Sequence, residues 1–228
     1  ALVSFNEALE AKEKRFGTDS VDYARTLNNL ANLHFSQGNL EEATGLYEQA
    51  LEIKREKLGD SSDEVANTLN NIAHILFTSG KMDDSIVAYT DVLRIRKKNL
   101  GKDHISVAVT LSNMGDVYMK QNDLHMSRIC FEQNVRIRRM AQPNHHAENA
   151  RATENLASVY AKLEEWSNAE FTYAMSLKMR KLLFHKNEKD TATRSDLVKT
   201  LKLLAFCQKK SGQSTAALET YAELELFL

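Results

Sequence analysis

The six residues Thr26-Leu27-Asn28-Asn29-Leu30-Ala31 return 42 positions later as Thr68-Leu69-Asn70-Asn71-Ile72-Ala73. They return again, in altered form, as Thr110-Leu111-Ser112-Asn113-Met114-Gly115. Asn155-Leu156-Ala157 keeps the same phase, and Leu203-Leu204-Ala205 arrives six residues late. Self-similarity at a fixed period marks a solenoid, in which each unit buries its apolar face only against its neighbours. Such arrays expose a long surface, so the pattern favours binding another protein over catalysis.

Each repeat is predicted to contain two helices. In the first complete repeat, apolar or small residues recur at spacings of three and four across residues 21–36, as one face of a helix requires. Ser20 and Ser62 precede two such helices and suit the N-cap position, where a hydroxyl accepts a bond from a free backbone N–H. Gly38 then interrupts the pattern, and a second helix is expected over residues 40–57.

Several other positions repeat with the same phase. A small residue, expected where two helices approach closely, stands at Ala31, Ala73, Gly115, Ala157 and Ala205. An aromatic residue of the second helix stands at Tyr47, Tyr89, Phe131, Tyr173 and Tyr221. The fourth and fifth repeats are less regular, and a longer loop is expected over residues 184–196.

These positions resemble the tetratricopeptide repeat (TPR) family, whose pattern is matched in order by Leu30, Ala31, Gly38, Ala43, Tyr47, Ala50 and Leu51. The common TPR unit has about 34 residues, and the longer unit here resembles the TPR domain of kinesin light chains, notably at residues 50–59 and 101–108. The resemblance implies an all-α, right-handed α-solenoid. The expected division is a single array over 1–228, with a second helix of a truncated repeat at 1–19, repeats at 20–61, 62–103, 104–145 and 146–193, and a last repeat at 194–228.

The charge of −1 hides an asymmetry, because residues 1–93 carry −8 and residues 94–228 carry +7. The arginines of the basic half lack an accompanying series of aromatic residues, so nucleic-acid binding is not expected. No apolar run is long enough to cross a membrane. The two distant cysteines are expected in the core and fit a cytoplasmic protein. The chain begins without methionine inside a repeat, so it is expected to be a fragment that can lack targeting signals.

The TPR resemblance implies that the first helix of each pair lines a concave groove. One groove position holds an asparagine in four repeats, and its amide can pair with the backbone of an extended peptide. Bonding between neighbouring repeats is the alternative role. This asparagine ladder comprises Asn29, Asn71, Asn113 and Asn155.

Further groove positions become basic toward the C-terminus, which favours an acidic ligand over the alternative of a solvated charged face. These expected peptide-binding cations are Lys120, Arg151, Lys162, Lys199, Lys202 and Lys210. Phe35, Phe77 and Met119 are either an apolar floor or residues buried between repeats.

The sequence thus predicts a non-enzymatic scaffold that binds an extended, acidic peptide segment, with the resemblance implying cargo-adaptor work. The alternative is a self-associating or autoinhibitory module, so a homo-oligomer stays open. No cofactor is expected. His145-His146 lacks a second ligand pair for a metal, and His74 with Asp116 lacks a third orienting group for catalysis.

Overall fold

The computed structural model describes residues 2–141 and 147–227. Within these residues every regular element is an α-helix. The chain divides into two compact units, residues 1–102 and 103–228. The fold class is therefore the predicted all-α solenoid, and the six-part division of the chain stays a prediction.

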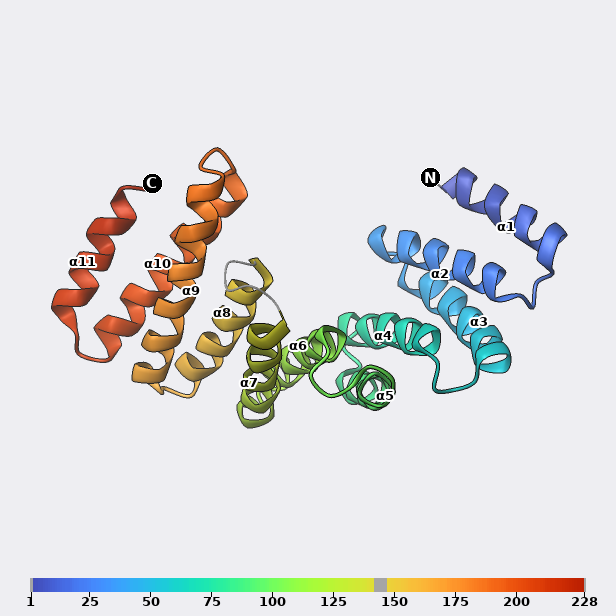
Figure 1. Ribbon diagram of the computed structural model, residues 1–228, viewed down its shortest axis with the longest axis horizontal. Helices are drawn as coiled ribbons and strands as arrows, with labels where there is room; N and C mark the ends of the chain where they lie inside the picture. Colours follow the sequence, from blue (N-terminus) through green and yellow to red (C-terminus); the bar gives the residue numbers. More distant parts are fainter. Residues whose placement is uncertain (1, 142–146, 228) are drawn as a thin grey trace. The chain divides into compact units, whose positions relative to one another are not determined.

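Unit 1 contains five helices in its described residues, each packed against the next (Figure 1). They are α1 (Leu2–Phe16), α2 (Val21–Ser36), α3 (Leu40–Leu58), α4 (Asp63–Thr78) and α5 (Met82–Leu100).

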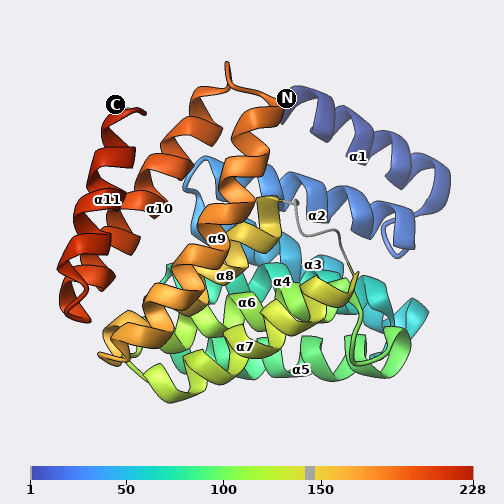
Figure 2. The ribbon, with the colours of Figure 1, turned by 60° about the vertical axis from the view of Figure 1, so that its left-hand side comes forward.

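Unit 2 contains six described helices in the same kind of succession (Figures 1 and 2). They are α6 (Ile105–Lys120), α7 (Leu124–Ala141), α8 (Ala147–Lys162), α9 (Trp166–Lys186), α10 (Thr191–Lys210) and α11 (Ser214–Glu225).

The predicted helix ends are confirmed in the first two complete repeats. Ser20 Oγ accepts from the backbone N–H of Tyr23 at 3.2 Å, and Ser62 Oγ accepts from that of Val65 at 3.3 Å. Gly38 lies at φ +84°, the left-handed conformation that ends α2 without a side-chain clash. His145-His146 lies outside the described residues.

The expected loop over residues 184–196 is wrong. The chain stays helical to Lys186 and resumes at Thr191, so only residues 187–190 connect α9 and α10. The six extra residues lengthen the two helices on either side of this connection, α9 to 21 and α10 to 20 residues. Inserted residues with helical spacing extend a helix as readily as they lengthen a loop.

The core is a series of small clusters between neighbouring helices instead of one centre. One cluster of unit 1 joins Leu51 of α3, Leu69 of α4 and Val92 of α5. The repeated aromatic residues Tyr47, Tyr89, Phe131 and Tyr173 are all buried, as are the small residues that face them. Tyr221 is the exception at 39% exposed. This layered burial is what the repeat period predicts.

Candidate binding surface

The exposed side of the first helices forms a regular line of side chains, which we call the first-helix stripe. It takes one residue per helical turn, with spacings of four, three and four, so its members share one face. In unit 1 the stripe comprises Arg25, Asn29, Asn32 and Ser36 of α2 and Asn67, Asn71, His74 and Thr78 of α4. In unit 2 it comprises Val109, Asn113, Asp116 and Lys120 of α6, Arg151, Asn155, Ser158 and Lys162 of α8, and Lys199, Leu203, Phe206 and Lys210 of α10.

The four asparagines of the ladder all lie on this stripe, but their surroundings differ. Asn29 is exposed, whereas Asn71, Asn113 and Asn155 are half-buried. Asn71 Nδ2 donates to Asn32 Oδ1 of the preceding first helix at 3.4 Å, and Tyr47 donates to the same oxygen. This contact is long, yet it joins neighbouring repeats. In unit 1 the ladder therefore contributes to packing between repeats, which was the alternative role.

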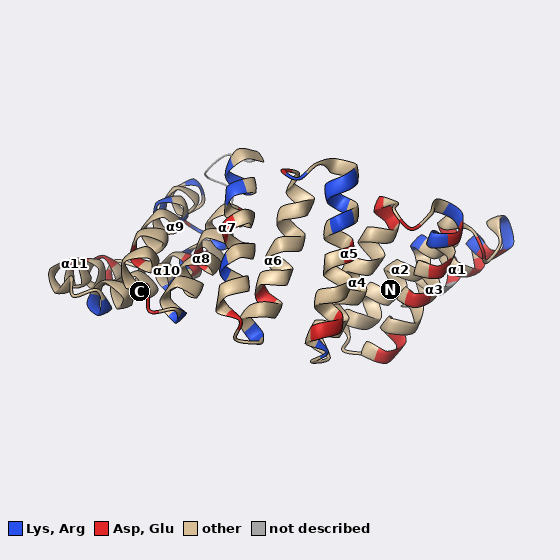
Figure 3. Ribbon diagram, turned by 90° about the horizontal axis from the view of Figure 1, so that it is seen from below, with Lys and Arg blue, Asp and Glu red and all other residues tan. Residues whose placement is uncertain are grey.

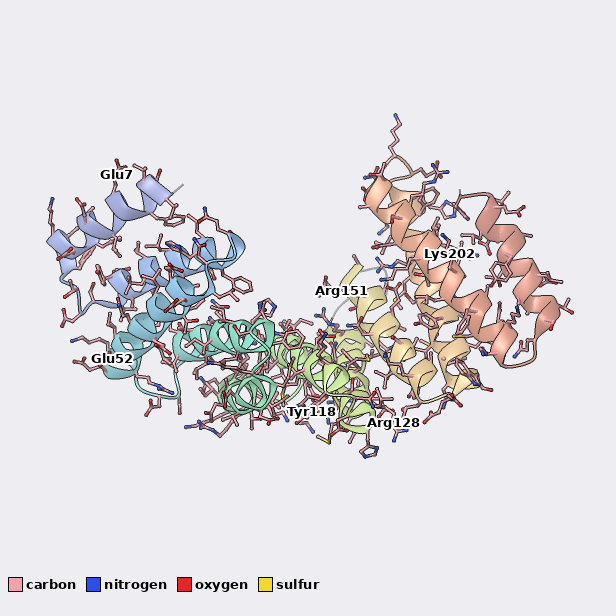
Figure 4. The ribbon with its side chains drawn as sticks, turned by 180° about the vertical axis from the view of Figure 1, so that it is seen from behind. Glu7, Glu52, Tyr118, Arg128, Arg151 and Lys202 are labelled. Carbon is pink, nitrogen blue, oxygen red and sulfur yellow. The ribbon has the colours of Figure 1, made fainter. Side chains whose placement is uncertain are left out.

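The expected cations lie at the ends and middle of the stripe in unit 2. Lys120 and Lys162 close α6 and α8, and both are exposed. Lys199, Lys202 and Lys210 are exposed along α10, with Lys202 beside the stripe (Figure 4). A hydrogen bond of 2.7 Å from Thr200 of α10 to Glu154 of α8 places these two helices side by side. Asn155 and Lys199, the sequence neighbours of the bonded pair, consequently belong to one surface.

These cations are not equally available to a ligand. Arg151 forms an ion pair with Glu148 at 2.7 Å, one turn away on the same helix. Lys120, Lys162, Lys199, Lys202 and Lys210 form no ion pair with any described residue. An acidic ligand on the stripe thus meets these five lysines without first displacing a carboxylate.

Part of the positive charge of residues 94–228 lies outside the first-helix stripe. Five of its cations lie between residues 94 and 102, at the end of α5 and just after it: Arg94, Arg96, Lys97, Lys98 and Lys102. Blue segments mark this end of α5 in Figure 3. The charge asymmetry of the sequence therefore overstates how basic the first-helix stripe is.

An aromatic pair lies among the lysines of α10. Phe206 is 45% exposed and packs edge-on against the half-buried Trp166, with 6.1 Å between ring centroids. The Lys210 ammonium lies 5.7 Å from the Phe206 ring and 5.9 Å from the Trp166 ring. The half-buried Trp166 therefore supports the exposed ring of Phe206.

Asp116 is the one carboxylate of the stripe in the described part of unit 2. Its side chain is exposed, but the surrounding protein displaces enough water to raise its pKa to about 6, while nearby Arg151 opposes that rise. His74, which was considered with Asp116 as a catalytic pair, belongs to unit 1. Among the described residues, no group of three His, Cys, Asp or Glu side chains could hold a metal ion.

The apolar residues expected near the groove are half-buried. Phe35 packs against the core of Ala31, Tyr47 and Ile75, and its ring meets His74 edge-on at 5.1 Å. Met119 packs against the cluster that contains Phe131. Both contacts favour the alternative that these residues fill the space between repeats.

A second ladder, made of buried cations, was not predicted from the sequence. Lys54, Arg96, Arg138 and Arg180 recur every 42 residues in the second helices, and all four are less than 9% exposed. Lys54 pairs with Glu64 at 3.1 Å, and Arg138 pairs with Glu148 at 3.4 Å. Their regular spacing was a visible signal, but buried cations are rare enough that charged positions were assigned to the surface.

Arg180, the last member of this second ladder, meets two carboxylates. Arg180 contacts both carboxylate oxygens of Glu154 on α8, at 2.9 and 3.0 Å, and reaches Asp196 of α10 at 2.6 Å. Burial alone would raise the pKa of Glu154, but the bonds from Arg180, Thr200 and Ser176 outweigh it and hold that pKa below its ordinary value. The network joins three consecutive helices of unit 2.

Comparison with known proteins agrees with this architecture. BtubC (BKLC) from P. vanneervenii has a TM-score of 0.84 at 20% sequence identity, and the match covers 99% of this chain and 89% of that one. A protein from Podosopora anserina, described as kinesin light chain nearly identical TPR-like repeats, has a TM-score of 0.68 at 18% identity, covering 89% and 93%. Apo RapI has a TM-score of 0.73 at 16% identity, covering 90% and 69%. At these identities the likeness concerns the fold.

The sequence comparisons fix the family. No curated protein matches the chain in sequence. The family model for the tetratricopeptide repeat matches residues 1–56, 64–140 and 106–181. With the repeated helix pairs and the buried small and aromatic residues that the family pattern requires, this match shows that the chain belongs to the tetratricopeptide repeat family.

Proposed function

We propose that this TPR chain is a non-enzymatic protein-interaction scaffold whose first-helix stripe in unit 2 binds an extended, acidic peptide segment. TPR arrays in general act as interaction scaffolds, because their stacked repeats present extended binding surfaces. One observation carries the finer proposal: exposed lysines without ion pairs surround the exposed ring of Phe206 on α10. Lysine ammonium groups attract carboxylates, and the ring offers an apolar anchor.

The proposed mechanism combines three contacts. Carboxylates of the peptide meet Lys199, Lys202 and Lys210, while an apolar side chain packs on Phe206. The amide of Asn155, which has no hydrogen bond to a described residue, pairs with the peptide backbone. Backbone pairing reads no side chain, so specificity rests on the charges and the anchor.

The likeness to kinesin light chain-like repeats supports a cargo-adaptor role as part of this proposal. An adaptor needs a surface that recognises short exposed segments of several partners, and lysines around one aromatic anchor meet that need. Both cysteines, Cys130 and Cys207, are buried and form no disulfide with each other, which fits a cytoplasmic location. None of the described helices combines the length and the apolar character of a membrane span.

The direct test is selection from a displayed library of extended peptides, followed by affinity measurement on two triple variants. Changing Lys199, Lys202 and Lys210 to Gln should weaken binding of the selected acidic peptides about tenfold or more, because charge-assisted contacts are lost. Changing Lys98, Lys186 and Lys189 to Gln removes the same charge from exposed positions elsewhere and should leave affinity within about twofold. Equal losses in both variants, or no acidic peptide selected by the folded parent, would reject the proposal.

Self-association is the second candidate, and one observation favours it. The last described helix, α11, exposes Leu218 at 69% and Tyr221 at 39%, and Leu226 just beyond it is 77% exposed. Exposed apolar residues gathered on one element often mark an interface. Light scattering over a range of concentrations separates the two candidates, since a scaffold for other proteins keeps a constant mass while a self-associating chain does not.

A further inference from the structure

A second groove lies in unit 2, between the second helices α7 and α9 with α8 at its base. Two adjoining hollows of about 510 and 450 Å³ share Val135 and Arg139 of α7 and Phe171 and Met175 of α9. We call this space the α7–α9 groove; α8 lies between the two helices in Figure 2.

The α7–α9 groove and the first-helix stripe use opposite faces of α8. The stripe takes Arg151, Asn155 and Lys162, whereas the base of the groove takes Asn149, Thr153 and Leu156. With 3.6 residues per turn, these two sets point about half a turn apart around the helix axis. A ligand in the groove consequently does not occupy the stripe.

Apolar side chains gather around this groove and stay exposed. Phe171 is 68% exposed, Met140 67% and Leu182 47%, while Val135 and Leu156 are buried below them. Single exposed apolar residues are ordinary, but several around one hollow indicate an interaction surface. Aromatic and methionine side chains are also enriched at protein–protein interfaces.

The rim of the groove is positively charged. Arg139 spans it from α7, donating to the sulfur of Met175 on α9 at 3.4 Å, and Lys178 lies one turn further along α9. Neither cation forms an ion pair with a described residue. The carboxylate at this groove is Glu132, which already accepts a hydrogen bond from Tyr160 at 2.9 Å. The groove thus presents uncompensated positive charge beside an apolar surface.

The matching hollow of unit 1 shows that this character is not a general property of the repeat. That hollow, about 440 Å³, lies between α3 and α4 and is lined by Leu51, Leu69 and Ile72. Its charged residues are Glu48, Glu52 and Arg55, so acids predominate there. In Figure 3, red segments mark α3 and blue segments mark α7.

The spacing of the lining residues favours a helical occupant. Phe171, Met175, Lys178 and Leu182 follow one another along α9 at intervals of four, three and four, so they form a single face about three turns long. Val135 and Arg139 present a similar face of α7 across the groove. Two such faces form a trough that an amphipathic helix can fill with residues one turn apart.

We infer that the α7–α9 groove is a second docking site, which binds an acidic amphipathic helix of a partner protein. Apolar side chains of that helix pack on Phe171, Met175 and Leu182, and its carboxylates pair with Arg139 and Lys178. The site is independent of the peptide-binding stripe. The chain can therefore hold two partner segments at once, an extended one on the stripe and a helical one in the groove.

The test uses three probes on the whole chain. These are a displayed library of helices of about 15 residues with apolar residues one turn apart and Glu at the flanks, the same library with Lys for Glu, and phosphatidylserine vesicles. We expect the folded parent to select helices from the acidic library and to retain neither of the other probes. The double variant Phe171→Gln, Arg139→Gln should weaken binding of selected helices about tenfold or more, since anchors dominate interface energies.

The matched control changes the equivalent positions of unit 1, Val87→Gln and Arg55→Gln, and should bind like the parent. Val87 is 65% exposed, so neither pair of changes disturbs a core. Failure to select acidic helices, equal affinity of both double variants, or vesicle binding that Phe171→Gln, Arg139→Gln abolishes would overturn the inference. The Lys199, Lys202, Lys210 variant should keep full affinity for the helix, which separates this site from the proposed function.

Discussion

At the scale of single residues, the most consequential finding is that four cations are buried in a protein otherwise held together by apolar layers. Arg180 illustrates why they are tolerated: its guanidinium is 6% exposed and meets Glu154, itself 14% exposed, and Asp196 on the next first helix. A buried charge is costly unless it is paired. For Lys54, Arg138 and Arg180 the pairing therefore makes the cation dependent on the first helix of the following repeat.

Arg180→Met should accordingly lower the free energy of unfolding by about 3–5 kcal/mol, because it leaves the Glu154 carboxylate buried without its cation. Urea unfolding measures the loss. Arg94→Met is the control, since Arg94 and Asp91 form a pair that is 60% and 47% exposed, and its effect should be at most about 1 kcal/mol. Adding Glu154→Leu to Arg180→Met should recover part of the stability, and a further loss would contradict the explanation.

Asp116 provides a pH-dependent test at the same scale. Its folded pKa of about 6 lies above the ordinary value of 3.8, so the folded state holds its proton more tightly than the unfolded state. The stability that the protonated Asp116 carboxyl contributes is fully present below pH 3.8 and is lost as the pH rises through 6. The melting temperature of Asp116→Asn, measured relative to that of the parent, should therefore rise between pH 3.8 and pH 6. Above pH 6 the difference should stay constant. A constant difference in melting temperature from pH 4 to pH 7.5 would exclude a raised pKa.

At the scale of helices, Gly115 of α6 shows how closely the first and second helices of a repeat approach. A Cβ at this position would lie 2.8 Å from Cζ of the fully buried Phe131 ring, and Ser127 of the same second helix donates to the Gly115 carbonyl at 2.9 Å. At the equivalent position the other repeats carry alanine, and their aromatic residue is tyrosine.

Gly115→Ala should lower stability by about 1–3 kcal/mol, because the new methyl group overpacks the ring. Gly45→Ala, in the middle of α3 where a Cβ meets nothing within 4 Å, should instead raise it by about 0.5–1 kcal/mol through reduced backbone entropy of the unfolded chain. Chemical denaturation of both variants measures these two changes in the free energy of unfolding. Phe131→Leu in the Gly115→Ala background should cost less than Phe131→Leu alone, and the same cost in both backgrounds would rule out the clash.

The helices could be predicted well and the binding surface only in part, for a physical reason. Glycine, serine caps and apolar spacing act within one or two turns, so α2 and α4 were found from short stretches of sequence. The bond from Asn71 to Asn32, the ion pair that engages Arg151 and the water excluded around Asp116 depend on neighbouring helices. The repeat period predicts the helix face on which these residues lie. It does not predict which of their side chains already form contacts with other parts of the protein.

At the scale of the whole chain, the net charge of −1 gives an acidic ligand no overall attraction. Binding of an acidic peptide must therefore depend on the local lysines of α10. At physiological ionic strength, salt screens the electrostatic field of these lysines beyond about 8–10 Å. Affinity for a selected acidic peptide should fall several-fold between about 0.02 M and 0.15 M salt, as measured by fluorescence anisotropy. The Lys199, Lys202, Lys210 variant should lose this salt dependence while the Lys98, Lys186, Lys189 variant keeps it. If both variants show the same salt dependence, charges outside the stripe attract the peptide. If salt does not change the affinity of the parent, the peptide is bound through Phe206 and the asparagine amides.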